Sequence, residues 1–260
     1  MKHIVISAQM GAVSNLVKNI VLLSPDIYWP LEQDRLQVVL NQYNPILKQD
    51  KSTWVSLEVA LNQRMGNYFL MDMDYRSVQD KLPGDRPAAF INHSLFWDLP
   101  VDFDQQLNFL DVVFVMPSTE FGLEWQTRAA TEKVMIPNLE HHYDFCFDPA
   151  DKQVKLPQYI QQHGEKNYIK FNVHSMRQVF KQQQDTLRAQ AINCPVLCLE
   201  DIILGSAQLI HHNITQALNI SLAVDQVHQV LHAWRSLHWA PEHTFNWPYT
   251  WSTNMDFPNE

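Results

Sequence analysis

The sequence predicts an α/β fold in which a central parallel sheet of about four or five strands lies between two layers of helices. Three observations support this prediction. Short apolar runs rich in β-branched residues, suited to strands buried on both faces, recur along the 260 residues. Stretches with helical apolar spacing alternate with these runs. Eight tryptophans and thirteen phenylalanines supply large side chains for a core. The length fits one α/β domain with insertions or two small domains, and we expect one domain over residues 1–260.

The opening stretch predicts a buried strand, a turn and a helix. Ile4-Val5-Ile6 is the strand, and apolar residues recur at helical spacing from Leu16. Gly11 lies in the turn, and Ser14 or Asn15 is a suitable N-cap. The start of a helix carries unpaired N–H groups and positive partial charge, so this turn is a candidate anion site. Alternatively, it is only the first strand and helix of an α/β domain.

Three further strands and several helices follow. The strands are expected at 87–93, 109–115 and 195–199. Helices are expected at 31–45, 54–65, 119–133, 172–191, 203–218 and 224–236. Residues 31–80 would form a helical insertion in the domain. The tail at 239–260 is rich in Trp, Phe, Pro and Asn, so we expect it to pack as irregular coil.

Polar residues follow two of these strands. In an open α/β sheet, ligands bind beyond the carboxyl ends of the strands. His93 ends the second predicted strand and is therefore a candidate for catalysis, although a histidine that fills a gap in a loop fits as well. Ser118 and Thr119 follow the third strand at the entry to a helix, and Arg128 lies about two and a half turns further along.

Composition excludes several classes of partner. The formal net charge of −9 argues against nonspecific nucleic-acid binding, which needs a basic surface. No run approaches the ~18 apolar residues of a membrane span, so we expect no membrane partner. The cysteines are odd in number, and Cys194 and Cys198 fall too far apart in one strand to bridge. A reduced, cytoplasmic protein is therefore expected, while these patterns carry no information on oligomeric state.

Two stretches contain side chains that bind metals in other proteins. Met71-Asp72-Met73-Asp74 alternates carboxylates with apolar residues, but no histidine or third carboxylate stands at ligand spacing. His141 and His142 are adjacent, and adjacent side chains of an extended chain point to opposite faces. We therefore expect no metal site.

Several segments, taken in order, resemble the sulfotransferase family. Pro195–Ile203 resembles the strand that ends in that family's Tyr-Glu-Asp-Leu, and Ala217–Ser221 is similar to the Leu-Gly-Leu ahead of its final helix. Phe90–His93 resembles the strand that ends in Thr-His, and Val112–Pro117 resembles the strand that leads to Arg-Asx-Pro. Order and approximate spacing cover most of the chain. The resemblance implies a P-loop NTPase-like, three-layer α/β/α fold.

The resemblance also implies a donor, 3′-phosphoadenosine 5′-phosphosulfate, with its 5′-phosphosulfate in the opening turn. The family has Pro-Lys-Ser-Gly-Thr-Thr-Trp there, and this chain has Gln9 in place of the lysine. Val115 and Leu123 stand in place of the arginine and serine that bind the 3′-phosphate. Lys18 is a candidate replacement for the missing lysine. The predicted donor-binding residues are Gln9, Met10, Gly11, Ala12, Val13, Ser14, Asn15, Lys18, Ser118, Thr119 and Arg128.

The function that the resemblance implies is transfer of a sulfuryl group to a hydroxyl of a small molecule or glycan, with His93 as general base and no metal. The missing lysine and arginine keep open a catalytically impaired nucleotide-binding or scaffold protein of the same fold. A P-loop kinase-like enzyme ranks lower, because Gly-x-x-x-x-Gly-Lys-Ser/Thr is absent. A plain α/β domain with similarity only in fold is a further alternative.

Overall fold

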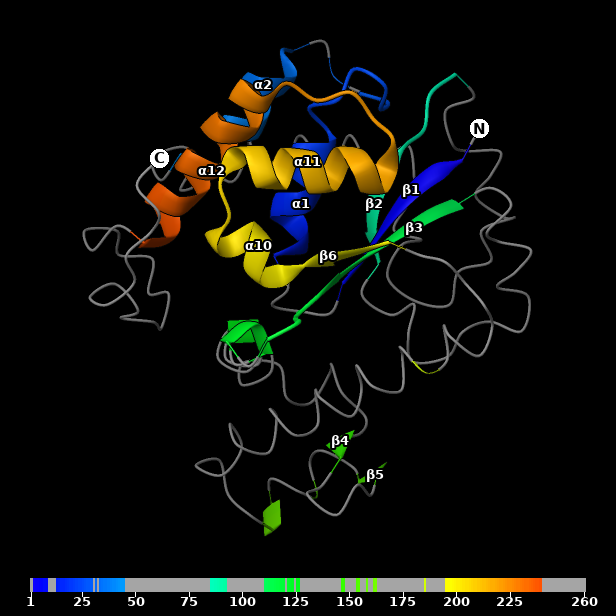
Figure 1. Cartoon of the computed structure of the whole chain (residues 1–260), viewed down its shortest axis with the longest axis vertical. Helices are drawn as coiled ribbons and strands as arrows, with labels where there is room; N and C mark the ends of the chain where they lie inside the picture. The colour runs from blue at the N-terminus through cyan, green and yellow to red at the C-terminus, as the bar shows by residue number, and fades with distance from the viewer. Residues whose placement is uncertain are drawn as a thin grey trace.

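The chain folds as a mixed α/β structure, as predicted (Figure 1). The computed structural model describes residues 2–8, 13–29, 31, 33–44, 85–92, 110–119, 121–123, 125–126, 146–147, 153–154, 158, 161–162, 185 and 195–239. The predicted helix at 54–65, most of the predicted helix at 172–191 and the tail beyond Trp239 lie outside these residues.

Four described strands form one parallel sheet. They are β1 (His3–Ala8), β2 (Ala89–Asn92), β3 (Leu110–Met116) and β6 (Val196–Cys198), in the order β2-β1-β3-β6. All three neighbouring pairs are parallel. A separate antiparallel pair joins β4 (Cys146–Phe147) to β5 (Gln153–Val154). The number of strands in the whole chain and the P-loop NTPase-like class stay predictions.

The central strand β1 is buried along its whole length, as its β-branched sequence predicts. Successive side chains of a strand point to opposite faces, so Val5 and Ile6 lie on opposite faces of the sheet. Neither is exposed, and the neighbouring Val113 and Phe114 of β3 are buried as well. Both faces of the sheet are therefore covered at its centre.

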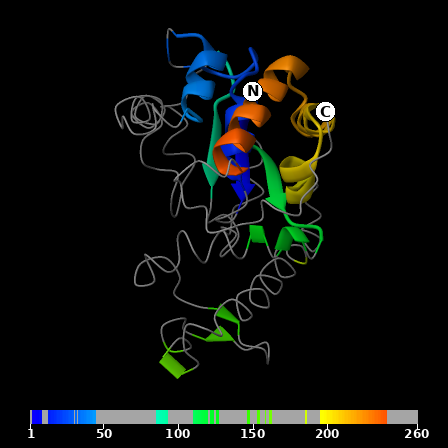
Figure 2. The ribbon, with the colours of Figure 1, turned by 90° about the vertical axis from the view of Figure 1, so that its left-hand side faces the viewer.

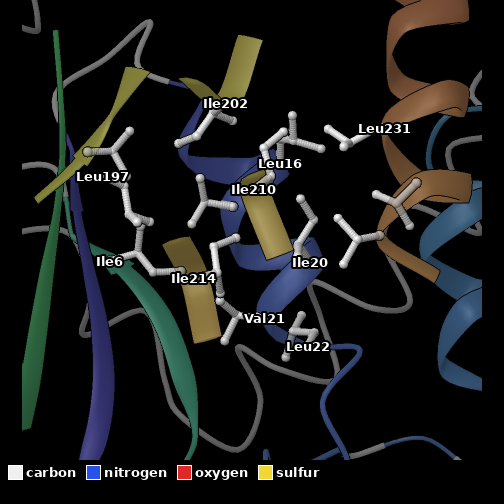
Figure 3. Packing of buried hydrophobic residues seen from close by; sticks show 14 of the residues in the cluster. Ile6, Leu16, Ile20, Val21, Leu22, Leu197, Ile202, Ile210, Ile214 and Leu231 are labelled. Atoms are coloured by element: carbon white, nitrogen blue, oxygen red, sulfur yellow. The ribbon is translucent and has the colours of Figure 1, made fainter. Parts of the chain in front are cut away.

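The described helices pack in two layers against one face of the sheet, and a helical layer on the opposite face stays a prediction. The helices α1 (Ser14–Val21) and α11 (Ala207–Leu218) contact the strands, and α12 (Val224–Trp239) contacts α1, α2 (Arg35–Asn41) and α11 (Figures 1 and 2). Side chains from successive layers meet in the core, among them Ile6 from β1, Ile20 from α1 and Leu231 from α12 (Figure 3). No helix among the described residues is long and apolar enough to cross a membrane.

The helix predicted at 203–218 is in fact two helices, α10 (Leu199–Leu204) and α11. The break falls at Gly205 and Ser206, and the Ser206 hydroxyl accepts a hydrogen bond from the N–H of Leu209 at 3.2 Å. Arg235 of α12 donates to the carbonyls of Ile203 and Gly205 at 3.1 and 2.6 Å. The break is stable because both helix ends that it creates find polar partners.

A long-range hydrogen bond joins the early helices to the late ones. The N–H of Ser221, in the turn between α11 and α12, donates to the Asp26 carboxylate at 2.7 Å. Asp26 lies just after α1, so this bond joins residues 195 positions apart along the chain. It reinforces the apolar contact between α1 and α12.

Candidate functional site at the switch point of the sheet

The strand order reverses direction between β1 and β3, which are neighbours in the sheet. The next strand of this sheet after β1 is β2, on one side of the pair, whereas the next after β3 is β6, on the other side. Ala8 of β1 pairs with Val115 of β3, so both strands end at the same edge of the sheet. In open parallel sheets the crevice at such a topological switch point is where ligands bind. The two turns that the sequence singled out follow β1 and β3, and both therefore start at this edge.

The turn after β1 enters helix α1 through a strained residue. Val13 is the N-cap, with φ 47° and ψ 28° in the left-handed region. The prediction that Ser14 or Asn15 caps the helix is wrong, because Val13 already accepts hydrogen bonds from the N–H groups of Leu16 and Val17 at 2.9 and 3.2 Å. A β-branched residue in this conformation is a genuine outlier.

Among the described residues, no side-chain hydrogen bond caps the start of α1. The first N–H groups of a helix have no partner within the helix, so those of Ser14 and Asn15 depend on other groups. Ser14 is buried and Asn15 is exposed. Strain of about 1–3 kcal/mol at a residue such as Val13 is typical of ligand clamps and active sites. The start of α1 thus has the local features of an anion-binding helix start.

The turn after β3 has a partner that the sequence did not predict. The Glu200 carboxylate, at the start of α10, accepts hydrogen bonds from the N–H groups of Ser118 and Thr119 at 2.9 and 2.6 Å. It also accepts bonds from their hydroxyls, at 3.2 Å from Ser118 and 2.7 Å from Thr119. A carboxylate of the chain itself therefore occupies the donors that were predicted to contact the nucleotide.

Glu200 is charged at neutral pH. Burial raises the pKa of its carboxyl, but hydrogen bonds from its own backbone N–H, from Thr119 and from Ser118 together have the larger effect. They hold the pKa below the usual value of 4.5. Because α10 brings Glu200 to the carboxyl edge of the sheet, the negative charge lies at the start of the helical residues 121–123, where the helix dipole stabilises it.

Gly122 makes the approach of this carboxylate possible. A Cβ atom at position 122 would lie 2.0 Å from Oε1 of Glu200 and 2.4 Å from its Cδ. The N–H of Gly122 instead donates to the Thr119 hydroxyl at 3.2 Å. Glycine is unfavourable in a helix, so a glycine at this position was the available sequence clue to a close contact.

The remaining predicted residues are distributed as follows. Lys18 is half-buried in the last turn of α1, about 6 Å along the helix axis from Ser14, so it lies away from the helix start. The other candidates lie outside the described residues: Gln9, Met10, Gly11, Ala12, His93 and Arg128. The acidic stretch at 71–74 and the histidines at 141–142 lie outside them too.

In the part of the chain that the structure describes, no group of three or more His, Cys, Asp or Glu side chains is arranged to hold a metal ion.

Comparison of the chain with protein-family models, with curated proteins and with solved structures finds no match. A functional assignment therefore depends on the two turns at the switch point and on the chemistry of their residues.

Proposed function

We propose that the chain binds the 5′-phosphosulfate of 3′-phosphoadenosine 5′-phosphosulfate at the β1–α1 turn and transfers the sulfuryl group to a hydroxyl acceptor. The observation that carries this proposal is the start of α1, which follows the central strand at the switch point of the sheet and has no side-chain cap from the residues that the structure describes. Backbone N–H groups and the positive end of a helix favour an anionic group there.

His93 would act as the general base. The strand β2 ends at Asn92, which pairs with Ser7 of β1, and His93 is the next residue in the sequence. His93 takes the proton of the acceptor hydroxyl as that oxygen bonds to sulfur. The bond from sulfur to the bridging oxygen breaks, and its electron pair leaves with 3′-phosphoadenosine 5′-phosphate. The N–H groups of residues 9–14 stabilise the negative charge of the group in transfer.

The turn after β3 favours a second candidate function. Glu200 occupies the N–H and hydroxyl groups of Ser118 and Thr119, which leaves these residues unsuited to hold a 3′-phosphate in this arrangement. Gln9 supplies no charge in place of the family's lysine. A nucleotide-binding or scaffold protein without catalysis is therefore the alternative. Both candidate functions include an anionic ligand bound at the start of α1, but only the sulfotransferase converts its ligand to products.

Ligand binding is tested by thermal unfolding with adenosine 3′,5′-bisphosphate, 3′-phosphoadenosine 5′-phosphosulfate or ATP. A ligand at a hundredfold excess over its dissociation constant stabilises the fold by about 2.7 kcal/mol. We expect stabilisation by the two adenosine 3′-phosphates and less by ATP. Stabilisation by ATP alone would favour a kinase-like enzyme, and no shift with any of them would overturn the proposal.

The variant Asn15→Asp tests whether this ligand binds at the start of α1. A carboxylate in the first turn stabilises a helix by about 0.3–1 kcal/mol but repels an anionic ligand. The variant should therefore unfold at higher temperature alone and lose most of the ligand-induced shift. Gln208→Asp is the matched control, since Gln208 is exposed at the same position of α11, which has the Ser206 cap. With ligand binding established, His93→Ala should abolish transfer and leave the shift intact.

A further inference from the structure

Two histidines lie side by side on the exposed face of α12. His228 and His232 are four residues apart, and both side chains are exposed. Their ring centroids are 6.4 Å apart, with 40° between the ring planes. Residues at this spacing are neighbours on one face of a helix. Asp225, also exposed, precedes His228 by three residues on the same stripe and adds negative charge.

The opposite side of α12 holds this pair in place. Val227, Val230 and Leu231 are fully buried, and Trp234 is nearly so. They pack into the core shared with α1 and α11. A helix anchored in this way presents its exposed side chains at a fixed spacing, which lowers the entropy lost when both bind one ligand.

We infer that His228 and His232 together bind one divalent transition-metal ion. Imidazole nitrogen is a preferred ligand of Zn²⁺, Ni²⁺ and Cu²⁺, and two histidines at this spacing on one helix are a known way to bind zinc. Two protein ligands leave the remaining positions to water or to another donor. Affinity should follow the general order for nitrogen sites, with Cu²⁺ above Ni²⁺ and Zn²⁺. The inference is independent of the function proposed at the switch point.

Isothermal titration of the full chain with NiCl₂ and with ZnCl₂ tests this site. The variants are His228→Gln, His232→Gln and the double substitution. The control is His212→Gln, because His212 is an exposed helical histidine of α11 with Gln216 rather than histidine four residues later. Circular dichroism confirms that each variant is folded.

We expect the unsubstituted chain and His212→Gln to bind with equal affinity at this site. Each single variant should bind about tenfold or more weakly, because the second ligand no longer acts at a high effective concentration. The double variant should lose one equivalent of metal. Electron paramagnetic resonance with Cu²⁺ should show two coordinated imidazole nitrogens in the unsubstituted chain and one in each single variant. Unchanged binding in the double variant, or no binding by the unsubstituted chain, would overturn the inference.

Discussion

The turns after β1 and after β3 lie at the same edge of the sheet and meet the same physical requirement in different ways. Each begins a helical segment whose first N–H groups need acceptors. After β3, the carboxylate of Glu200 supplies the acceptor, from 82 residues along the chain. After β1, the chain enters α1 through the strained Val13, and no described side chain caps the helix. The donors of the turn after β3 are satisfied by the chain itself, whereas the start of α1 is where we propose an external anion.

The largest effect should come from removing the internal carboxylate. Glu200→Ala removes the acceptor for four donor groups, the backbone N–H and hydroxyl groups of Ser118 and Thr119. We expect these lost bonds to lower the free energy of unfolding, measured with urea, by about 2–3 kcal/mol. The loss is no larger because Ser118 and Thr119 are exposed, so water replaces the carboxylate as their partner. A loss below about 0.5 kcal/mol would show that Glu200 does not cap this turn.

Acid should remove the same stabilisation. The pKa of Glu200 is lower in the folded than in the unfolded chain, so its contribution is complete above about pH 4.5 and is lost as the pH falls through the folded value. The difference in unfolding free energy between the unsubstituted chain and Glu200→Gln should therefore be constant near neutral pH. It should shrink below about pH 4.5, and a difference that grew on acidification would contradict the assignment.

Gly122→Ala should have a smaller effect on the free energy of unfolding, and the sign of this effect should depend on whether Glu200 is present. The new methyl group would meet Glu200 Oε1 at 2.0 Å, and the carboxylate must move away. We expect a loss of about 1–2 kcal/mol, part of the value of the cap. In the Glu200→Ala background the same change should instead stabilise by up to about 1 kcal/mol, because alanine is a better helix former than glycine. A double-mutant cycle measures this coupling, and additive effects would argue against direct contact.

The smallest effect concerns the strained turn. Val13→Asn should stabilise the fold by about 0.5–1 kcal/mol, because asparagine tolerates the left-handed region better than a β-branched residue. The reverse change, Asn219→Val, is the matched control, since Asn219 ends α11 with φ 50° and ψ 49°. It should destabilise by a similar amount or more. If Val13→Asn is more stable and binds the adenosine bisphosphate more weakly, then Val13 is retained for binding rather than for folding.

The local pattern of apolar residues predicted which helices and strands of the described fold exist better than it predicted where they begin and end. The β-branched run of β1 and the apolar stripe of α1 were sufficient to place both. The break at Gly205 was missed because the groups that stabilise it include Arg235, which is 30 residues away. Likewise, sequence placed Ser118 and Thr119 at the correct edge of the sheet, and the strand predicted at 195–199 ends just before Glu200. It gave no reason to expect that the Glu200 carboxylate accepts hydrogen bonds from Ser118 and Thr119. Periodicity is a local property, whereas the partner of a freed N–H or carbonyl depends on tertiary contacts.

The bond between Asp26 and Ser221 has a consequence for how the chain folds during synthesis. The apolar faces of α1 and α2 gain their cover from α12 only after about 200 further residues have been added. At ordinary rates of translation that interval is roughly 10–40 s. During it, the nascent chain exposes the surface around Leu16 and Ile20, which the finished fold buries completely. Ribosome-associated chaperones that bind apolar segments would therefore have access to the segment that contains α1 and α2.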